Sequence, residues 1–308
     1  MTLCVAAVCR KDENAPYIVT ASDYLLSSGI TSTEARMPKY AYASPWEPHS
    51  WGMMYSGDPT TAKLILSYAF QILKEKTSET TCGVEAVMAA YEEAFQRTLA
   101  RIAEDRYLGR LLTNMEHFRS FGKDQLGEKA FLMLLKKIER VKLSVDVLIA
   151  GFSVNGKPSI FKVSDDFGVA TDFYDQIGYA AIGQGAIAAE HSMDALFDPI
   201  APLDEIIYRV AEAKFKGELA RSVGSSTLIT VHSHTGNWHR ITTEDADRFR
   251  GAWMERYKSV PKDISAAMEG SLKTIIWPDI GKVSNQQERE TRIRSSPDTP
   301  DPPFTKNT

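Results

Sequence analysis

The order of strand-like and helix-like segments most constrains the fold of this 308-residue sequence. Short β-rich segments come first, two helical segments follow, strands return, two more helical segments follow, and a hairpin closes the pattern. Helices paired between runs of antiparallel strands favour two packed sheets that are covered on their outer faces. We therefore predict an α+β fold, a four-layer αββα sandwich, with extra helices and a disordered C-terminal tail.

Local signals place the elements. Apolar residues alternate over 2–9, and the β-rich segment Tyr17–Asp23 follows a polar turn, so a hairpin is predicted here. Asn155-Gly156 is the strongest hairpin signal in the chain. Asp58 followed by Pro59 is a typical helix start. The other predicted strands cover 39–44, 51–56, 144–153, 159–163, 177–182, 225–234 and 238–242, and the predicted helices cover 58–76, 83–112, 126–140, 203–220 and 245–257, with a short one ending near 196.

These elements suggest a division of the chain. We expect one domain over 1–242, with a helical insertion at about 112–140. A helical extension over 243–283 follows it. Residues 284–308 are rich in Gln, Glu, Arg, Ser and Pro with almost no apolar side chains, which is typical of disorder.

Composition narrows the class of protein. Hydrophobic residues make up 43%, enough for a large core, and 36 basic and 40 acidic residues are spread along the chain. No basic stripe indicates nucleic acid, no apolar run reaches the roughly 18 residues of a membrane span, and no secretory signal is recognised. We expect a cytoplasmic protein with no nucleic-acid or membrane partner.

Cysteine and histidine spacing gives no sign of a metal or cofactor. Cys4, Cys9 and Cys82 contain no Cys-x-x-Cys pair and are expected to be small core residues. His232 and His234 share a strand face, but no third ligand follows at a defined spacing. Motifs of serine hydrolases, zincins and phosphate-binding loops do not occur either. We expect no cofactor.

The second residue carries the main chemical signal. An initiator Met1 is removed when the next residue is as small as Thr2, so the mature chain would begin with a hydroxyl and an α-amine on one residue. A Thr hydroxyl is a weak nucleophile, and an α-amine with a pKa of about 8 can accept its proton near neutral pH. A Met-Thr start is common by chance, so Thr2 needs support from the rest of the chain.

Several further segments resemble the proteasome β-type subunit family, in its bacterial proteasome-like form, within the N-terminal nucleophile hydrolases. The resemblance extends from Thr2 to about Thr242. Besides Thr2, it is carried by Asp23 at the end of Val-Thr-Ala-Ser-Asp, Lys39 sixteen residues later, Met-Tyr-Ser-Gly at 54–57, Val-Leu-Ile-Ala-Gly-Phe at 147–152 and Tyr-Ala-Ala-Ile-Gly-Gln-Gly at 179–185.

The resemblance implies a catalytic site for a threonine endopeptidase. Thr2 would attack a peptide carbonyl with its own amine as base. Lys39 would stay cationic beside the hydroxyl, and Asp23 would orient it. The backbone N–H of Ser56 matches the family's oxyanion donor, a contribution typically worth about 3 kcal/mol of barrier.

The resemblance also implies a substrate pocket. Its lining residues would include Leu26, Met37 and Met54, which are all apolar. Cleavage after hydrophobic residues is therefore expected, with a broad preference because Met side chains adapt their shape.

The chain departs from the family where other groups hold the nucleophile's amine. Active members carry a Ser where this chain has Gln184, and an Asp and a Ser where the best register gives Ala220 and Val223. Gln184 can still form a hydrogen bond, and Ser225 or Glu218 is a candidate replacement after a small shift of the register. By analogy with metal sites, such supporting groups matter by about 10–100-fold. The sequence therefore leaves open whether the activity is weak or lost.

Three hypotheses follow. The first is a self-compartmentalising threonine peptidase that forms a homo-oligomeric ring and degrades peptides or unfolded proteins, with an ATPase unfoldase as a partner for its chamber. The second is a catalytically inactive, proteasome-like structural subunit, favoured by Gln184 and Val223. The third is an amidase of the same fold that acts on a small amide.

Overall fold

The computed structural model describes residues 2–12, 14–23, 25–28, 31–34, 39–46, 51–111, 113–165, 168–220 and 223–258. The chain divides into two units, Met1–Met254 and Glu255–Thr308. Only the end of one helix is described in the second unit, so the predicted 284–308 tail lies outside the described residues. The predicted division into three segments stays a prediction. No helix among the described residues is both long and apolar enough to cross a membrane.

The first sheet contains the N-terminal strand. Strands β1 (Leu3–Cys9) and β2 (Tyr17–Asp23) form the predicted hairpin, and the antiparallel order is β10–β1–β2–β11–β12. Leu3 pairs with Gly183, and Asp23 pairs with Thr227. The start of β1 and the end of β2 therefore lie at the same edge of the sheet. The other strands are β10 (Tyr179–Gly183), β11 (Thr227–Ser233) and β12 (Trp238–Arg240).

The second sheet is also antiparallel and contains five strands. Its order is β5 (Tyr40–Tyr42), β6 (Trp51–Gly57), β7 (Val145–Phe152), β8 (Pro158–Ser164) and β9 (Ala170–Phe173). A separate ribbon is formed by β3 (Leu25–Ser28) and β4 (Thr31–Glu34). The ribbon and β9 were not predicted because their four-residue sequences lack the regular alternation of apolar and polar residues that marks a half-buried strand.

Two helices cover the second sheet. Helix α1 (Pro59–Lys76) begins at the predicted cap, where the Asp58 carboxylate accepts the Thr61 N–H at 2.7 Å. Helix α2 (Val84–Ala103) packs beside it, and both join one apolar core with β6, β7 and β8. The predicted helix to 112 is interrupted, since a π turn at 104–108 and a 3₁₀ turn at 109–111 follow α2.

Three helices pack on the first sheet. Helices α5 (Ala186–Leu196), α6 (Leu203–Gly217) and α7 (Thr243–Lys258) share a core with β1, β2 and β11. A further core joins residues of both sheets, including Cys4 of β1 and Met54 of β6. Cys4, Cys9 and Cys82 are buried and free, as predicted.

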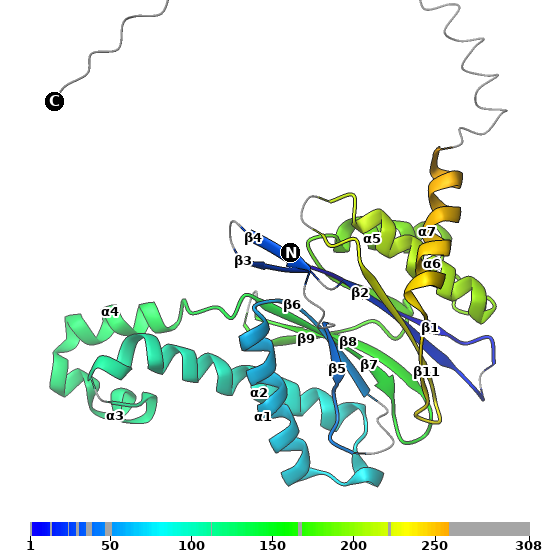
Figure 1. Cartoon of the computed structure of the whole chain (residues 1–308). Coiled ribbons are helices and arrows are strands. Elements are labelled where there is room, and N and C mark those ends of the chain that lie inside the picture. The colour runs from blue at the N-terminus through cyan, green and yellow to red at the C-terminus, as the bar shows by residue number, and fades with distance from the viewer. Residues whose placement is uncertain are drawn as a thin grey trace, which may run out of the picture. The chain divides into compact units, whose positions relative to one another are not determined.

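The four-layer αββα sandwich predicted from the sequence is wrong as a description of this chain. The described residues form two antiparallel five-stranded sheets, a separate two-stranded ribbon and seven α-helices. Helices α3 (Met115–Leu126) and α4 (Glu128–Ile138) project away from both sheets (Figure 1), and their core contains no strand residue. Helical periodicity predicts that a helix has an apolar face but does not predict which element packs against it. The expectation that paired helices cover the outer faces of both sheets was therefore too general.

The helical insertion itself differs from its prediction. One helix was expected over 126–140, but two are present, and Gly127 at φ +76° separates them. Helix α3 lies within the helical insertion predicted over about 112–140, but it was not assigned as a separate helix because most of its residues are charged or polar. Its start follows Asn114, whose side chain accepts the His117 N–H.

Candidate active site

Lys39 lies between Thr2 and Asp23. Its Nζ donates a hydrogen bond to Thr2 Oγ1 and forms an ion pair of 2.9 Å with Asp23 Oδ1. The exposed fractions of Thr2, Lys39 and Asp23 are 5%, 2% and 0%. A lysine buried this deeply is costly unless it is paired and hydrogen-bonded, and here it is both. The structure thus brings together the three residues that the sequence singled out, while their catalytic role stays a prediction.

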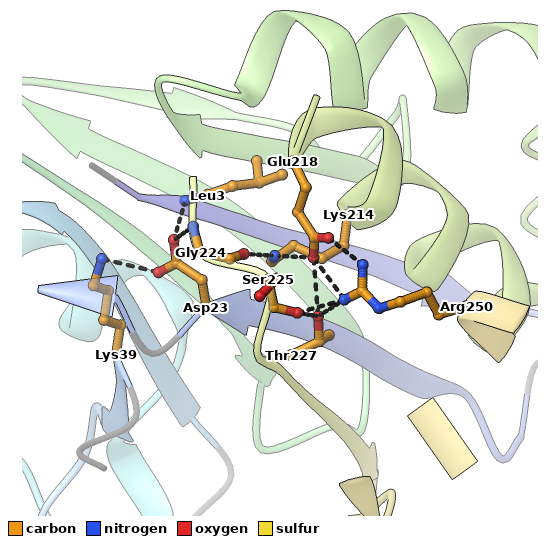
Figure 2. Close-up of polar contacts among 9 residues, drawn as sticks. All are labelled: Leu3, Asp23, Lys39, Lys214, Glu218, Gly224, Ser225, Thr227 and Arg250. Atoms are coloured by element: carbon orange, nitrogen blue, oxygen red, sulfur yellow. Dashed lines mark hydrogen bonds and ion pairs between the residues drawn. The ribbon is translucent and has the colours of Figure 1, made fainter. Parts of the chain in front are cut away.

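The other oxygen of Asp23 is held by two backbone groups. Its Oδ2 accepts the N–H of Leu3 and the N–H of Gly224, each at 3.3 Å (Figure 2). Leu3 begins β1, and Gly224 precedes β11. The carboxylate is therefore fixed by three segments that are far apart in the sequence, which fixes Lys39 in turn.

The turn after β10 packs against the backbone of Thr2. The carbonyl of Thr2 accepts the Gln184 N–H at 2.9 Å. Gly183 has a φ of +95°, and a Cβ at this position would lie 2.1 Å from the Thr2 carbonyl oxygen and 3.4 Å from the Ser56 Cβ. Only glycine fits this conformation and this space. Gln184 therefore contacts Thr2 through its backbone.

Ser56 lies close to this turn, near the end of β6. It is 6% exposed, and its Oγ donates to Asp146 Oδ2 at 3.3 Å. Asp146 is paired in turn with Lys162 at 3.6 Å. Sequence reasoning missed Asp146 and Lys162, although each is a charged residue within an apolar strand, a pattern that could have drawn attention to them. The assignment of the Ser56 N–H as an oxyanion donor stays a prediction.

The predicted substrate pocket is only partly described. Met54 is 0% exposed and packs in the core between the sheets. Leu26 lies on β3, where it pairs with Thr33. Met37 lies outside the described residues. The role of these three residues in substrate binding stays a prediction.

A second charged cluster lies beside this site and contains Lys214, Glu218 and Arg250. Lys214 Nζ donates to the Gly224 carbonyl at 2.9 Å and pairs with Glu218 at 2.5 Å. Arg250 of α7 contacts Glu218 at 3.1 Å and also donates to the carbonyl of Ser225. Ser225, predicted to support the nucleophile, is thus joined to this cluster. Sequence reasoning named Glu218 as a candidate support but missed Lys214 and Arg250, because a lysine four residues before a glutamate at a helix end is usually part of an exposed pair.

The buried lysine is electrostatically constrained. Burial lowers the pKa of Lys214, and the nearby charge of Glu218 opposes this shift.

Burial raises the pKa of the Cys4 thiol, and the charge of Asp23 raises it further. A thiol that does not ionise is a poor nucleophile, so Cys4 is not a rival to Thr2. Among the described residues, no group of three or more His, Cys, Asp and Glu side chains could hold a metal ion.

The candidate hydroxyl nucleophile, Thr2, directly precedes the first strand, β1. The chain is similar in fold to three solved Anbu structures, with TM-scores of 0.55–0.56. These are a Gly-1 mutant from Hyphomicrobium sp. strain MC1 (14% identity, 91% of this chain and 100% of that chain), the ancestral beta-subunit from Yersinia bercovieri (13%, 91% and 100%) and a helical assembly from Pseudomonas aeruginosa (16%, 91% and 99%).

This similarity corrects the resemblance drawn from the sequence. No family model matches the chain. No curated protein matches it either. The similar solved structures are Anbu proteins, which are proteasome-like but distinct from the proteasome β-type family proper, so that assignment was wrong. At these identities the similarity shows the fold alone.

Proposed function

We propose that this chain is a threonine peptidase subunit of a proteasome-like homo-oligomer, in which removal of Met1 frees the amine of Thr2. The observation that carries the proposal is the hydrogen bond from Lys39 to Thr2 Oγ1, together with the ion pair between Lys39 and Asp23. A buried ammonium beside a hydroxyl stabilises negative charge as it develops on that oxygen.

The reaction follows from this arrangement. The Thr2 amine accepts the hydroxyl proton as Oγ1 attacks the carbonyl carbon of a peptide bond. The C–N bond then breaks, and the proton passes to the departing amine, leaving an ester on Oγ1. Water, activated by the same amine, cleaves the ester and restores the hydroxyl. The Ser56 N–H would bind the carbonyl oxygen while it carries negative charge.

The substrate class is part of the proposal. If Leu26, Met37 and Met54 line the pocket, residues before the cleaved bond would be apolar. Peptides or unfolded proteins are the expected substrates, and the cytoplasmic location stays a prediction.

Assembly would provide selectivity. The Anbu complex from Pseudomonas aeruginosa forms a helical assembly, which supports an oligomer for a chain of the same fold. A homo-oligomeric ring remains the prediction for this chain, with an ATPase unfoldase as its partner. Native mass spectrometry measures the number of subunits directly.

Hydrolysis of fluorogenic peptides tests the proposed chemistry. The purified chain should cleave peptides with an apolar residue before the fluorophore, and Thr2→Ala should abolish this cleavage. Thr2→Ser should retain a part of it, because it keeps the hydroxyl and the amine. Thr61→Ala, which changes a buried threonine of α1 far from β1 in the sequence, is the matched control and should cleave normally. Equal cleavage by wild type and Thr2→Ala would contradict the proposal.

The inactive structural subunit is the second candidate. It is favoured by Gln184 and Val223, which stand where serines were expected to support the amine of the nucleophile. An oligomer that forms normally but cleaves no peptide would support this candidate. Cleavage of small amides without cleavage of peptides would instead support the amidase.

A further inference from the structure

The second charged cluster connects the C-terminal helix α7 to Asp23. Gly224 is the link, because its N–H donates to Asp23 Oδ2 at 3.3 Å while its carbonyl accepts from Lys214 Nζ at 2.9 Å. Lys214 pairs with Glu218, and Glu218 pairs with Arg250 of α7 (Figure 2). A continuous series of polar contacts therefore runs from α7 to the candidate nucleophile.

Each charged group in this series has several fixed partners. Glu218 also accepts from Thr227 Oγ1 at 3.1 Å, and Arg250 donates to Thr227 Oγ1 at 3.2 Å. The guanidinium carbon of Arg250 lies 4.4 Å from the ring centre of Phe215. Exposed fractions are 0% for Lys214, 8% for Glu218 and 26% for Arg250. A buried network with its partners in place is rigid, and removing one charge leaves the others poorly compensated.

The second charged cluster lies beside the segment in which the sequence lacks the expected supporting Asp and Ser side chains. Ala220 and Val223 stand where an Asp and a Ser were expected, and they flank the approach to Gly224. Lys214, Glu218 and Arg250 surround the same segment from α6 and α7, and Arg250 also binds the carbonyl of Ser225. The structure thus supplies a different set of groups to fix this backbone.

We propose that Lys214, Glu218 and Arg250 are positioning residues that hold the Gly224 peptide against Asp23, and through Asp23 hold Lys39 beside Thr2. This inference rests on the proposed function of Thr2, and it deepens that proposal in one respect. Helix α7 becomes part of the catalytic unit, because its Arg250 pairs with Glu218 and donates to the carbonyl of Ser225, next to Gly224. None of the three residues touches the reacting atoms.

Arg250→Met tests the inference in the full-length protein. Removing the guanidinium should lower kcat for an apolar peptide by about 10–100-fold, the range known for groups that orient others, while KM stays unchanged. Arg250→Lys keeps a cation near Glu218 and should recover part of the lost rate. The matched control is Arg248→Met on the same helix, since Arg248 is 70% exposed and pairs with Glu244 and Asp245 of the same helix. It should behave as wild type.

A readout that does not depend on activity separates this inference from the proposed function. Hydrogen exchange of the Gly224 amide should be at least about tenfold faster in Arg250→Met than in wild type or Arg248→Met, because local opening sets the exchange rate. Glu218→Gln, which keeps the side-chain shape, should show the same increase. Far-UV circular dichroism verifies that each variant is folded.

The outcomes are distinct. Slower turnover with faster Gly224 exchange in Arg250→Met, partly restored in Arg250→Lys, supports the inference. Unchanged Gly224 exchange in folded Arg250→Met and Glu218→Gln overturns it, whatever the activity. A wild-type protein that cleaves no substrate, but whose Gly224 amide is protected, overturns the proposed function instead.

Discussion

Two lysines are buried near the start of β1, and they differ in what completes their hydrogen bonding. Lys39 is 2% exposed and Lys214 is 0% exposed, and each pairs with a carboxylate, Asp23 or Glu218. Lys39 also contacts the hydroxyl of Thr2, whereas Lys214 also contacts the carbonyl of Gly224. A cation that faces a hydroxyl can stabilise a reacting oxygen, while one that faces a fixed carbonyl can only hold the backbone.

The same comparison explains how the two sites depend on each other. Asp23 and Gly224 share one hydrogen bond, so the fixed cluster ends where the candidate reactive cluster begins. Changes at Lys39 should therefore affect chemistry most, and changes at Lys214 should affect stability first. The predictions below test this division, beginning with the largest effect.

Lys39→Met should give the largest loss of activity. It removes the ammonium beside Thr2 Oγ1, and the loss of one such electrostatic group costs about 100–1000-fold in kcat. Peptide hydrolysis measures this loss, and Lys63→Met, which changes an exposed lysine of α1, is the control. Activity within the range of wild type would show that Lys39 is a structural lysine like Lys214.

Gly183→Ala should lower kcat by displacing Thr2. The added Cβ would lie 2.1 Å from the Thr2 carbonyl oxygen, so Thr2 must shift, and a misplaced nucleophile loses about 100-fold in rate. Gly156→Ala is the matched control, since Gly156 also has a positive φ, +76°, but nothing lies within 4 Å of its added Cβ. Comparing kcat of the two variants separates backbone strain from displacement of Thr2. Equal losses would contradict the packing described here.

Lys214→Met should mainly lower the free energy of unfolding, because Lys214 does not contact Thr2 directly. Breaking a buried ion pair costs about 3–5 kcal/mol, and the remaining pair between Glu218 and Arg250 should keep the loss at the lower end. Urea denaturation followed by circular dichroism measures the free energy of unfolding. The exposed pair of Lys123 and Glu128 provides the control, because Lys123→Met should change stability little. No difference between the two variants would remove the structural role of Lys214.

The smallest predicted effect concerns pH and lies away from both lysines. Burial lowers the pKa of His232 well below its usual value, and Nε2 of this residue lies 3.0 Å from the Tyr40 hydroxyl. The folded state then binds fewer protons than the unfolded state below about pH 6.5, so acidification destabilises the fold by up to about 1.4 kcal/mol per pH unit from this group.

The His232 prediction is tested by comparing two variants. His232→Gln should reduce the fall in melting temperature between pH 7 and pH 5. Differential scanning fluorimetry in steps of about 0.2 pH unit measures this fall. His239→Gln, on the exposed side of the same hairpin, should leave the wild-type slope unchanged. Identical slopes for both variants would contradict the prediction.

Local signals predicted much of the fold. The hairpin of β1 and β2, the Asn-Gly turn and the capped start of α1 each depend on a few neighbouring residues. The ribbon of β3 and β4 and the separate packing of α3 with α4 depend on contacts that periodicity does not specify. This is why the predicted four-layer arrangement failed although most of its elements are present.

The candidate site was predictable to a similar degree. Thr2, Asp23 and Lys39 were recognised because their spacing matched a known pattern, and the structure brings them together. The assignment to the proteasome β-type family was wrong, because the similar solved structures reported above are Anbu proteins. Lys214 and Arg250 were missed because they lie 36 residues apart on two amphipathic helices, where charged residues are usually solvent-exposed.

The most direct measurement is peptide mapping by mass spectrometry after treatment with a peptide epoxyketone, which reacts with a hydroxyl and an amine on one residue. The account predicts that the mature chain begins at Thr2 and that the adduct is found on this residue, with no adduct in Lys39→Met over the same time. An N-terminal peptide that keeps Met1 and carries no adduct would contradict the central claim.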